Sequence, residues 1–256
     1  VNQGMILGED GQKMSKSRGN AINPDFVVEN YGADSLRLYE MFMGPLTQMK
    51  SWSMKGVEGV YRFLGRIWRL YVDREGNLDA GIVNDKPDGN IQKLLHRTIK
   101  KVTQDIDTLQ CNTAISALMI FSNELAKETT KPREVMEGLL LLLAPFAPHM
   151  TEELYQGLRL SVLGSQLSVH KEGADRLNKS TEGTENRKLK TENWSIHTSS
   201  WPVFDQAAIE QGETVIAVQV SGKLRSTVNL QRAEGVEQRE IEAMAKTIYN
   251  YWFVQF

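Results

Sequence analysis

The chain lacks the residues on which several protein classes depend. It has a single cysteine, Cys111, in 256 residues, so no intramolecular disulfide can form, which fits a reducing compartment. The four histidines are scattered, and none has a cysteine or a second histidine at zinc-ligand spacing, so we expect no protein-bound metal. No apolar run is long enough to span a bilayer, so we expect no membrane partner.

The bulk composition is that of a globular protein. Hydrophobic residues make up 41% and charged residues 24% of the chain, and its length suits one large or two modest domains. A net charge of -2 argues weakly against nucleic-acid binding, but phosphates respond to local basic patches rather than to the sum. The first residues, Val1 to Gly4, show neither a starting methionine nor a signal peptide, and we interpret the sequence as starting inside a longer protein.

Apolar residues recur at three- and four-residue steps, which predicts a mainly α fold. The pattern is clearest between Ile91 and Leu109. The predicted helices are Asn23 to Gly32, Asp34 to Gly44, Val57 to Val72, Ile91 to Leu109, Asn112 to Glu128, Pro132 to Leu143 and a short one from Thr151 through Tyr155. Four main helices with short links predict an antiparallel helix bundle.

Both ends of the chain differ from this helical middle. Gly4 to Gly11 is predicted to form a short strand and a turn, and the segment 76–89 to form a loop. Lys171 to Glu192 is rich in charge and poor in large apolar residues, which indicates a flexible insertion. Beyond it, alternating residues predict a hairpin with strands Thr214–Val220 and Lys223–Leu230, followed by a helix from Glu237 to Ala245.

The residues Lys13-Met14-Ser15-Lys16-Ser17 are predicted to form a polar loop whose side chains could take part in a reaction. Lysines on a mobile loop can meet negative charge that builds on a leaving phosphate in a transition state. Serine hydroxyls and neighbouring backbone N–H groups supply further donors to phosphate oxygens. The alternative is a lysine-rich loop that only meets solvent.

The pentapeptide resembles the signature loop of one class of aminoacyl-tRNA ligases, and Arg18-Gly19-Asn20 continues it as in the leucine, isoleucine, valine and methionine enzymes. Several segments resemble the bacterial-type leucine–tRNA ligases specifically. They are Met41 to Leu46, Trp52-Ser53 and Gly56 to Leu64. Tyr31 to Arg37, Leu143 to Met150 and Val218 to Arg225 resemble further parts of these enzymes, so the likeness covers about four-fifths of the chain.

The resemblance implies a fold and a function. The family activates leucine with ATP and attaches it to leucine tRNA for translation. Lys13 and Lys16 would act on the ATP phosphates, with Lys16 the stronger candidate, and Met14, Ser15 and Ser17 would complete the ATP-binding loop. Mg²⁺ would accompany ATP in the full-length enzyme. We also expect a monomer inside the cell, in a bacterial cytoplasm, a mitochondrion or a chloroplast.

The resemblance also suggests how the chain is divided. Residues 1–22 would be the loop region and the end of a nucleotide-binding fold, and 23–55 a helical connecting segment. The anticodon-binding helix bundle would occupy 56–160, the polar insertion 161–200, and a small truncated α+β domain that binds tRNA 201–256.

Three basic groups are candidates for contact with the tRNA backbone. Arg62, Arg66 and Arg69 share one face of a predicted helix. A second group lies opposite the apolar stripe of the Ile91 helix and comprises Lys93, Arg97, Lys100 and Lys101. A third group, Lys223 and Arg225, lies on the C-terminal hairpin. Such stripes can neutralise phosphates, whereas the alternative is an ordinary solvated face. The resemblance implies recognition of the shape and backbone of the tRNA rather than of its bases.

Two other functions stay open on the sequence. The family's upstream His-x-Gly-His motif does not occur here, so we expect this polypeptide alone to be inactive. It could then be a stand-alone, non-catalytic tRNA-binding module, although such a module has no need of Lys13 and Lys16. It could also belong to a valine, isoleucine or methionine–tRNA ligase, but the segment Trp52 to Leu64 favours the leucine enzymes over these.

Overall fold

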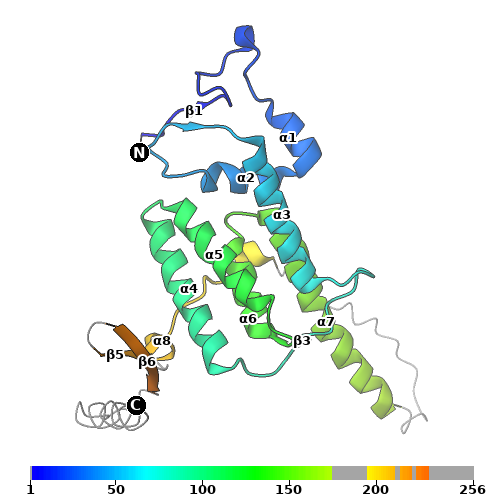
Figure 1. The fold of residues 1–256 in the computed structure, drawn as a ribbon. Helices are drawn as coiled ribbons and strands as arrows, with labels where there is room; N and C mark the ends of the chain where they lie inside the picture. Colours follow the sequence, from blue (N-terminus) through cyan, green and yellow to red (C-terminus); the bar gives the residue numbers. More distant parts are fainter. Residues whose placement is uncertain (1, 175–194, 211–213, 221–222, 231–256) are drawn as a thin grey trace, which may run out of the picture.

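The computed structural model describes residues 2–174, 195–210, 214–220 and 223–230, with side chains for 2–161 and 195–209. This part of the chain is mainly helical, as predicted (Figure 1). A small N-terminal unit leads into a group of long helices, and a short hairpin follows them along the chain.

The long helices α3 to α7 enclose the core. Their bounds are Met54–Tyr71, Gly89–Asp107, Cys111–Leu125, Arg133–Leu143 and Pro148–Ala174. The largest fully buried side chains include Tyr71, Phe63 and Phe121, which come from α3 and α5. Removing such large apolar surfaces from water is the main force that holds helices together. The predicted helices between Val57 and Leu143 are confirmed to within a few residues.

Local sequence explains where these helices begin. At α3, the hydroxyl of Ser53 accepts a hydrogen bond from the Gly56 N–H at 3.3 Å. At α4, the Asp88 carboxylate accepts one from the Ile91 N–H at 2.8 Å. Each side chain satisfies an N–H group that has no partner within the helix. Neither α3 nor α4 contains proline, so the apolar stripe of each runs without interruption.

The N-terminal unit pairs distant pieces of chain. Strand β1 (Ile6–Leu7) lies parallel to β2 (Lys50–Ser51). Helices α1 (Pro24–Tyr31) and α2 (Ala33–Phe42) lie between them in sequence. Asn23 caps α1 through the Asp25 N–H at 3.0 Å, and Gly32, with φ 86°, turns the chain into α2. The predicted strand and both predicted helices are confirmed.

Helix α7 corrects one prediction. The sequence suggests a short helix through Tyr155 and a polar insertion from Ser161 to Ser200, but α7 continues to Ala174. Helix η2 (Ile196–Thr198) then packs against α7 with Ile196 buried, so helical elements lie at both ends of the expected insertion, whose assignment as a separate segment stays a prediction. The segment 161–174 has no proline to end a helix, and one buried side chain, that of Ile196, leaves little trace in local composition.

Two short strands lie where the sequence predicts a loop and the start of a helix. Strands β3 (Ile82–Val83) and β4 (Lys131–Pro132) pair in parallel, which joins the 76–89 segment to the start of α6. A pair of two-residue strands depends on tertiary contact, so sequence pattern alone could not predict it.

The C-terminal part agrees with the prediction as far as it is described. Helix α8 (Gln206–Glu210) lies against α4, and β5 (Thr214–Val220) pairs antiparallel with β6 (Lys223–Leu230). The predicted turn Ser221-Gly222 and helix Glu237 to Ala245 lie outside the described residues. Among the residues described, no helix is both long and apolar enough to cross a bilayer.

Candidate functional site

The Lys13–Ser17 loop follows a tight hairpin that begins at β1. The Gly8 N–H donates to the Gln12 carbonyl at 2.8 Å, and Leu7 forms an isolated antiparallel bridge with Lys13. Lys16 to Arg18 then form one turn of 3-10 helix, η1, which ends at Gly19 with φ 70°. A left-handed residue of this kind favours glycine, so the position of Gly19 in the motif has a backbone reason.

The side chains of the loop differ in their exposure to solvent. Lys13 and Lys16 are exposed, whereas Met14 is partly buried and packs against the hydrophobic core. Within the described residues neither lysine forms an ion pair. The Ser15 and Ser17 hydroxyls lie 2.8 Å apart. The loop therefore presents two ammonium groups to solvent from an anchored backbone, an arrangement suited to an anion such as phosphate.

Asn20 closes this loop, a role that sequence reasoning missed. Its amide oxygen accepts the Ser15 N–H at 2.8 Å, and its amide nitrogen donates to the Asp10 carboxylate at 3.0 Å and to the Lys13 carbonyl at 3.3 Å. The backbone N–H of Gln12 and the Asn20 amide help to hold the pKa of Asp10 below its usual value. An Asn three residues after a serine- and lysine-rich loop was the available signal.

The hairpin is tied to helix α3 through Glu9. Its carboxylate oxygen accepts the Met54 N–H at 2.8 Å, at the first residue of α3. A carboxylate at this end of a helix is stabilised both by the free N–H group and by the helix dipole. Glu9 thus connects the loop of exposed lysines to the helix that carries the predicted arginine stripe.

The arginine stripe on α3 exists as predicted in position. Arg62, Arg66 and Arg69 are all exposed, and Arg62 lies 3.8 Å from Glu58 in a loose ion pair. The Arg66 guanidinium lies 5.9 Å from the centre of the Phe63 ring. In the described part of the chain, Arg66 and Arg69 have no carboxylate partner. Their charge is therefore available to an external anion.

The basic residues of α4 do not form one free patch. Lys101 pairs with Asp105 at 2.6 Å. The Lys100 ammonium lies 3.1 Å from the Gln206 amide oxygen and 5.3 Å from the centre of the Phe204 ring, so the chain itself covers this side chain. Lys93 is half-buried and Arg97 is exposed. Lys223 and Arg225 lie on β6, where side chains are outside the described part.

A second connection joins α2 to the start of α7. The Asp34 carboxylate is buried and accepts three hydrogen bonds, from the Met150 N–H at 2.7 Å, the His149 N–H at 3.3 Å and the His149 ring Nδ1 at 2.7 Å. One turn later, Arg37 donates through Nε and Nη2 to the Pro145 carbonyl at 3.1 and 2.9 Å. Together these side chains fix the α6–α7 corner against α2.

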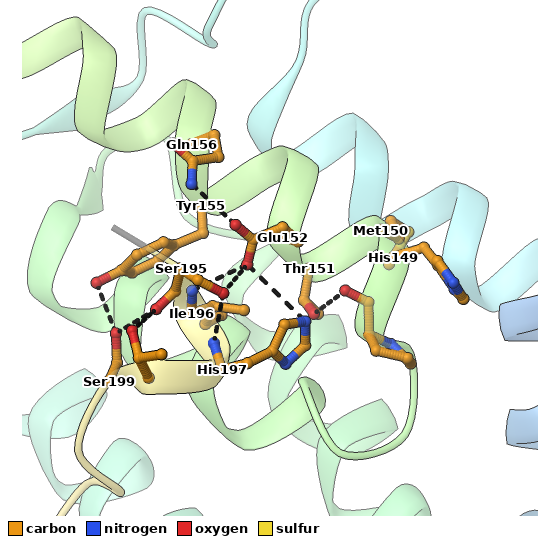
Figure 2. A network of polar contacts seen from close by, with 12 residues as sticks. His149, Met150, Thr151, Glu152, Tyr155, Gln156, Ser195, Ile196, His197 and Ser199 are labelled. Atoms are coloured by element: carbon orange, nitrogen blue, oxygen red, sulfur yellow. Dashed lines mark hydrogen bonds and ion pairs between the residues drawn. The ribbon is translucent and has the colours of Figure 1, made fainter. Parts of the chain in front are cut away.

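Figure 2 shows how α7 holds the segment that returns to it. The Glu152 carboxylate accepts hydrogen bonds from the Ile196 N–H at 2.9 Å and the Ser195 hydroxyl at 3.0 Å, and the His197 ring lies 3.8 Å away. Burial raises the pKa of Glu152, but hydrogen bonds from Gln156, Ile196 and Ser195 outweigh burial and lower it overall. This network places the residues that follow over α4.

The described residues hold no group of three or more histidine, cysteine, aspartate or glutamate side chains that could bind a metal ion. The loop itself offers lysines and hydroxyls.

Comparison with known proteins gives two family matches. Residues 88–241 match the family described as "Anticodon-binding domain of tRNA ligase", and residues 1–53 match "tRNA synthetases class I (I, L, M and V)". The second match ends just after β2, so it includes the loop of exposed lysines and the helices α1 and α2.

Similar whole proteins point the same way. The chain is 44% identical to a leucine–tRNA ligase of Chloroherpeton thalassium over 95% of its own length and 26% of the relative's. It is 45% identical to that of Chlorobaculum tepidum, over 96% and 27%. A leucine enzyme from Agrobacterium radiobacter K84, solved in a ternary complex with tRNA and LeuAMS, has a TM-score of 0.67 and 26% identity over 95% of this chain and 29% of that one. The chain thus spans about a quarter of the length of the curated relatives it matches.

Proposed function

Because the chain belongs to the leucine–tRNA ligases, a family of class I aminoacyl-tRNA ligases, we propose that it supplies the ATP-handling loop and a tRNA-binding surface to leucine activation and transfer. The resemblance predicted from the loop and from Trp52 to Leu64 is confirmed. The comparisons do not favour the stand-alone module or the valine, isoleucine and methionine enzymes.

At the loop, we propose that Lys16 and Lys13 meet the phosphates of ATP as pyrophosphate leaves. In leucine activation the leucine carboxylate attacks the α-phosphate of ATP, and negative charge grows on the departing pyrophosphate. An ammonium group that meets this charge better in the transition state than in the ground state accelerates the step. The exposure of both lysines, and their lack of an ion pair within the described residues, support this role.

The observation that carries the tRNA proposal is the arginine stripe on α3. Arg62, Arg66 and Arg69 occupy one exposed face of a helix whose first turn is capped by Glu9, next to the loop. A rigid helix can hold such charges at fixed spacing along a phosphate backbone. Arg97 and Lys93 on α4, and Lys223 and Arg225 on β6, are secondary contacts in this proposal, whereas Lys100 and Lys101 would first have to leave their partners within the chain.

The finer architecture follows from the same proposal. Helices α3 to α7 would form the antiparallel anticodon-binding bundle, residues 1–22 the end of the nucleotide-binding fold, and the β5–β6 hairpin part of a small α+β domain that meets tRNA. Mg²⁺ would arrive with ATP, and the enzyme would act as a monomer. Since the two curated relatives described above come from bacteria, we propose the bacterial cytoplasm as its compartment.

Two experiments test these roles separately. In a complete ligase that contains this chain, Lys16→Ala should slow ATP–pyrophosphate exchange by about 100- to 1,000-fold and leave tRNA affinity almost unchanged. In the 256-residue chain, Arg66→Ala should weaken leucine tRNA binding and reduce the slope of log affinity against log salt by about 1. Lys127→Ala, which removes a surface charge paired with Glu124 on α5, is the matched control. Unchanged exchange, or an unchanged salt slope, would remove the residue concerned from its role.

A further inference from the structure

A pocket of about 430 Å³ opens at the C-terminal end of α3. Its walls come from the last turn of α3, from the turn that follows it and from one side of α7. The volume lies within the range of about 300–1,000 Å³ that is usual for sites of small organic groups. The lining residues that matter here are Trp68, Asp73, Arg74, Glu153 and Gly157.

Trp68 is the feature of this pocket that needs an explanation. Its side chain is 38% exposed, although the rest of the apolar stripe of α3 is buried. Within the described part of the chain its indole N–H has no hydrogen-bond acceptor, whereas Trp52 donates to Met54 Sδ at 3.2 Å and Trp201 to Thr103 Oγ1 at 2.8 Å. A tryptophan that is partly exposed and unpartnered offers a flat apolar face and one free donor.

The other wall offers acceptors and space. Glu153 and Gly157 lie one helical turn apart on α7, so they face the pocket together. Glu153 is exposed and has no ion pair within the described residues, and a Cβ placed on Gly157 would meet nothing within 4 Å. Asp73 is partly engaged, since its carboxylate accepts the N–H groups of Glu75 and Asn77 at 2.9 and 2.8 Å.

The charges exclude a phosphate as the occupant of the pocket itself. Two carboxylates, Asp73 and Glu153, face a single guanidinium, that of Arg74. An anion would be repelled, but a planar ring with N–H groups would find a stacking face at Trp68 and an acceptor at Glu153. Adenine, cytosine and guanine each carry an exocyclic amino group, whereas uracil does not.

Besides Arg74 in the pocket lining, further positive charge lies next to the pocket on α3. Arg69 follows Trp68 on α3, and its Nη1 would be 3.9 Å from a Cβ at Gly65, so the guanidinium folds back along the helix surface. The exposed Arg66 lies one turn before it, and the exposed Tyr61 lies on the same side of α3 as Trp68. A nucleotide could therefore place its base in the pocket and its phosphates on the arginines.

We propose that this pocket binds one unstacked, amino-bearing base of the tRNA, stacked on Trp68 with its amino group donating to Glu153. The inference rests on the proposed tRNA-binding function and adds to it a specific contact that phosphate neutralisation alone does not provide. Single-stranded nucleotides are commonly held in this way, by an aromatic platform next to a basic track.

The test uses the 256-residue chain and a leucine tRNA transcript, with affinity measured over a range of salt concentrations. Trp68→Ala should weaken binding by about 5- to 150-fold, the loss of one stacked base, without changing the salt slope, because no phosphate contact is lost. Trp68→Phe, which keeps an aromatic face, should bind within about 3-fold of the wild type. Ile120→Ala, at a side chain of α5 that is 61% exposed, is the control for loss of exposed apolar surface.

Chemical probing of the tRNA identifies the base that the pocket holds. Dimethyl sulfate methylates unpaired adenine and cytosine, and kethoxal modifies unpaired guanine. The wild-type complex should protect one unpaired nucleotide that the Trp68→Ala complex leaves reactive, with other protections retained. If Trp68→Ala binds like the wild type and protects the same bases, the pocket assignment is wrong, while the arginine stripe keeps its role. If the wild-type chain does not bind the transcript at all, both the pocket assignment and the tRNA-binding surface are overturned.

Discussion

The Asp34 carboxylate caps helix α7 from another part of the chain: its Oδ2 accepts the Met150 N–H at 2.7 Å, across 116 positions of sequence. A side chain usually caps its own helix from the preceding residue. Here the cap comes from α2, the helix that follows the signature loop, so the start of α7 depends on the placement of α2. Arg37 strengthens this by holding the Pro145 carbonyl at the other side of the same corner.

Removing this cap should lower the stability of the whole helical unit. Asp34→Ala should reduce the free energy of unfolding by about 1–3 kcal/mol, because partly buried N–H groups lose a charged acceptor. Asp34→Asn should cost less, since the amide oxygen can still accept one hydrogen bond. The measurement is urea unfolding followed by circular dichroism. Glu29→Gln, an exposed acidic residue on α1, should stay within about 0.5 kcal/mol of the wild type, and an Asp34→Ala variant that did the same would show that the cap is dispensable.

Two glycines of α3 should respond in opposite directions to the same substitution. A Cβ at Gly56 would lie 2.5 Å from Tyr39 Cε2, and Tyr39 is buried against Trp52 with ring centroids 4.9 Å apart. Gly56→Ala should therefore destabilise by about 1–3 kcal/mol. At Gly59 a Cβ would meet nothing within 4 Å, so Gly59→Ala should stabilise by about 0.5–1 kcal/mol through helix propensity. Thermal unfolding of both variants measures the difference, and equal effects would contradict the packing of Tyr39.

Asn20 should control access to the signature loop. Asn20→Ala removes the acceptor of the Ser15 N–H and the donor to Asp10, so the loop should open more often. Trypsin cleavage after Lys13 and Lys16 should then become faster, by about 3- to 10-fold if one net hydrogen bond is lost. Asn30→Ala, where the side chain donates only to the Phe26 carbonyl of its own helix, is the control. Equal cleavage rates in the wild type and Asn20→Ala would mean that Met14 alone anchors the loop.

Much of the fold follows from local pattern, and the parts that do not are long-range polar contacts. Helices α3 and α4 are predictable because an apolar stripe and an adjacent cap are both visible in sequence. The Asp34 cap is not, because its partners lie more than a hundred residues away and an aspartate on an ordinary helix gives no signal. Lys100 illustrates the same limit. It lies on the polar face of α4, yet Phe204 and Gln206 cover it, and nothing near Lys100 in sequence indicates this.

The segment held by Glu152 should loosen in acid. The folded pKa of Glu152 lies below its ordinary value of 4.5, so ionisation stabilises the fold. This contribution is fully present above pH 4.5 and is lost as the pH falls through the folded pKa. Hydrogen exchange at the Ile196 amide, measured between pH 6 and pH 3, should rise below about pH 4.5 beyond the intrinsic rate change. Glu152→Gln should lack this extra rise, and an identical profile in both proteins would contradict the assigned hydrogen bonds.

The most direct measurement is binding of the 256-residue chain to leucine tRNA and to methionine tRNA, each at two salt concentrations. We expect tighter binding to leucine tRNA, and a marked loss of affinity for it at the higher salt as phosphate contacts weaken. This result would show that the α3 stripe and its surroundings form a working and selective tRNA surface. Equal affinity for the two tRNAs, or no salt-sensitive binding to either, would contradict the proposed role of this chain.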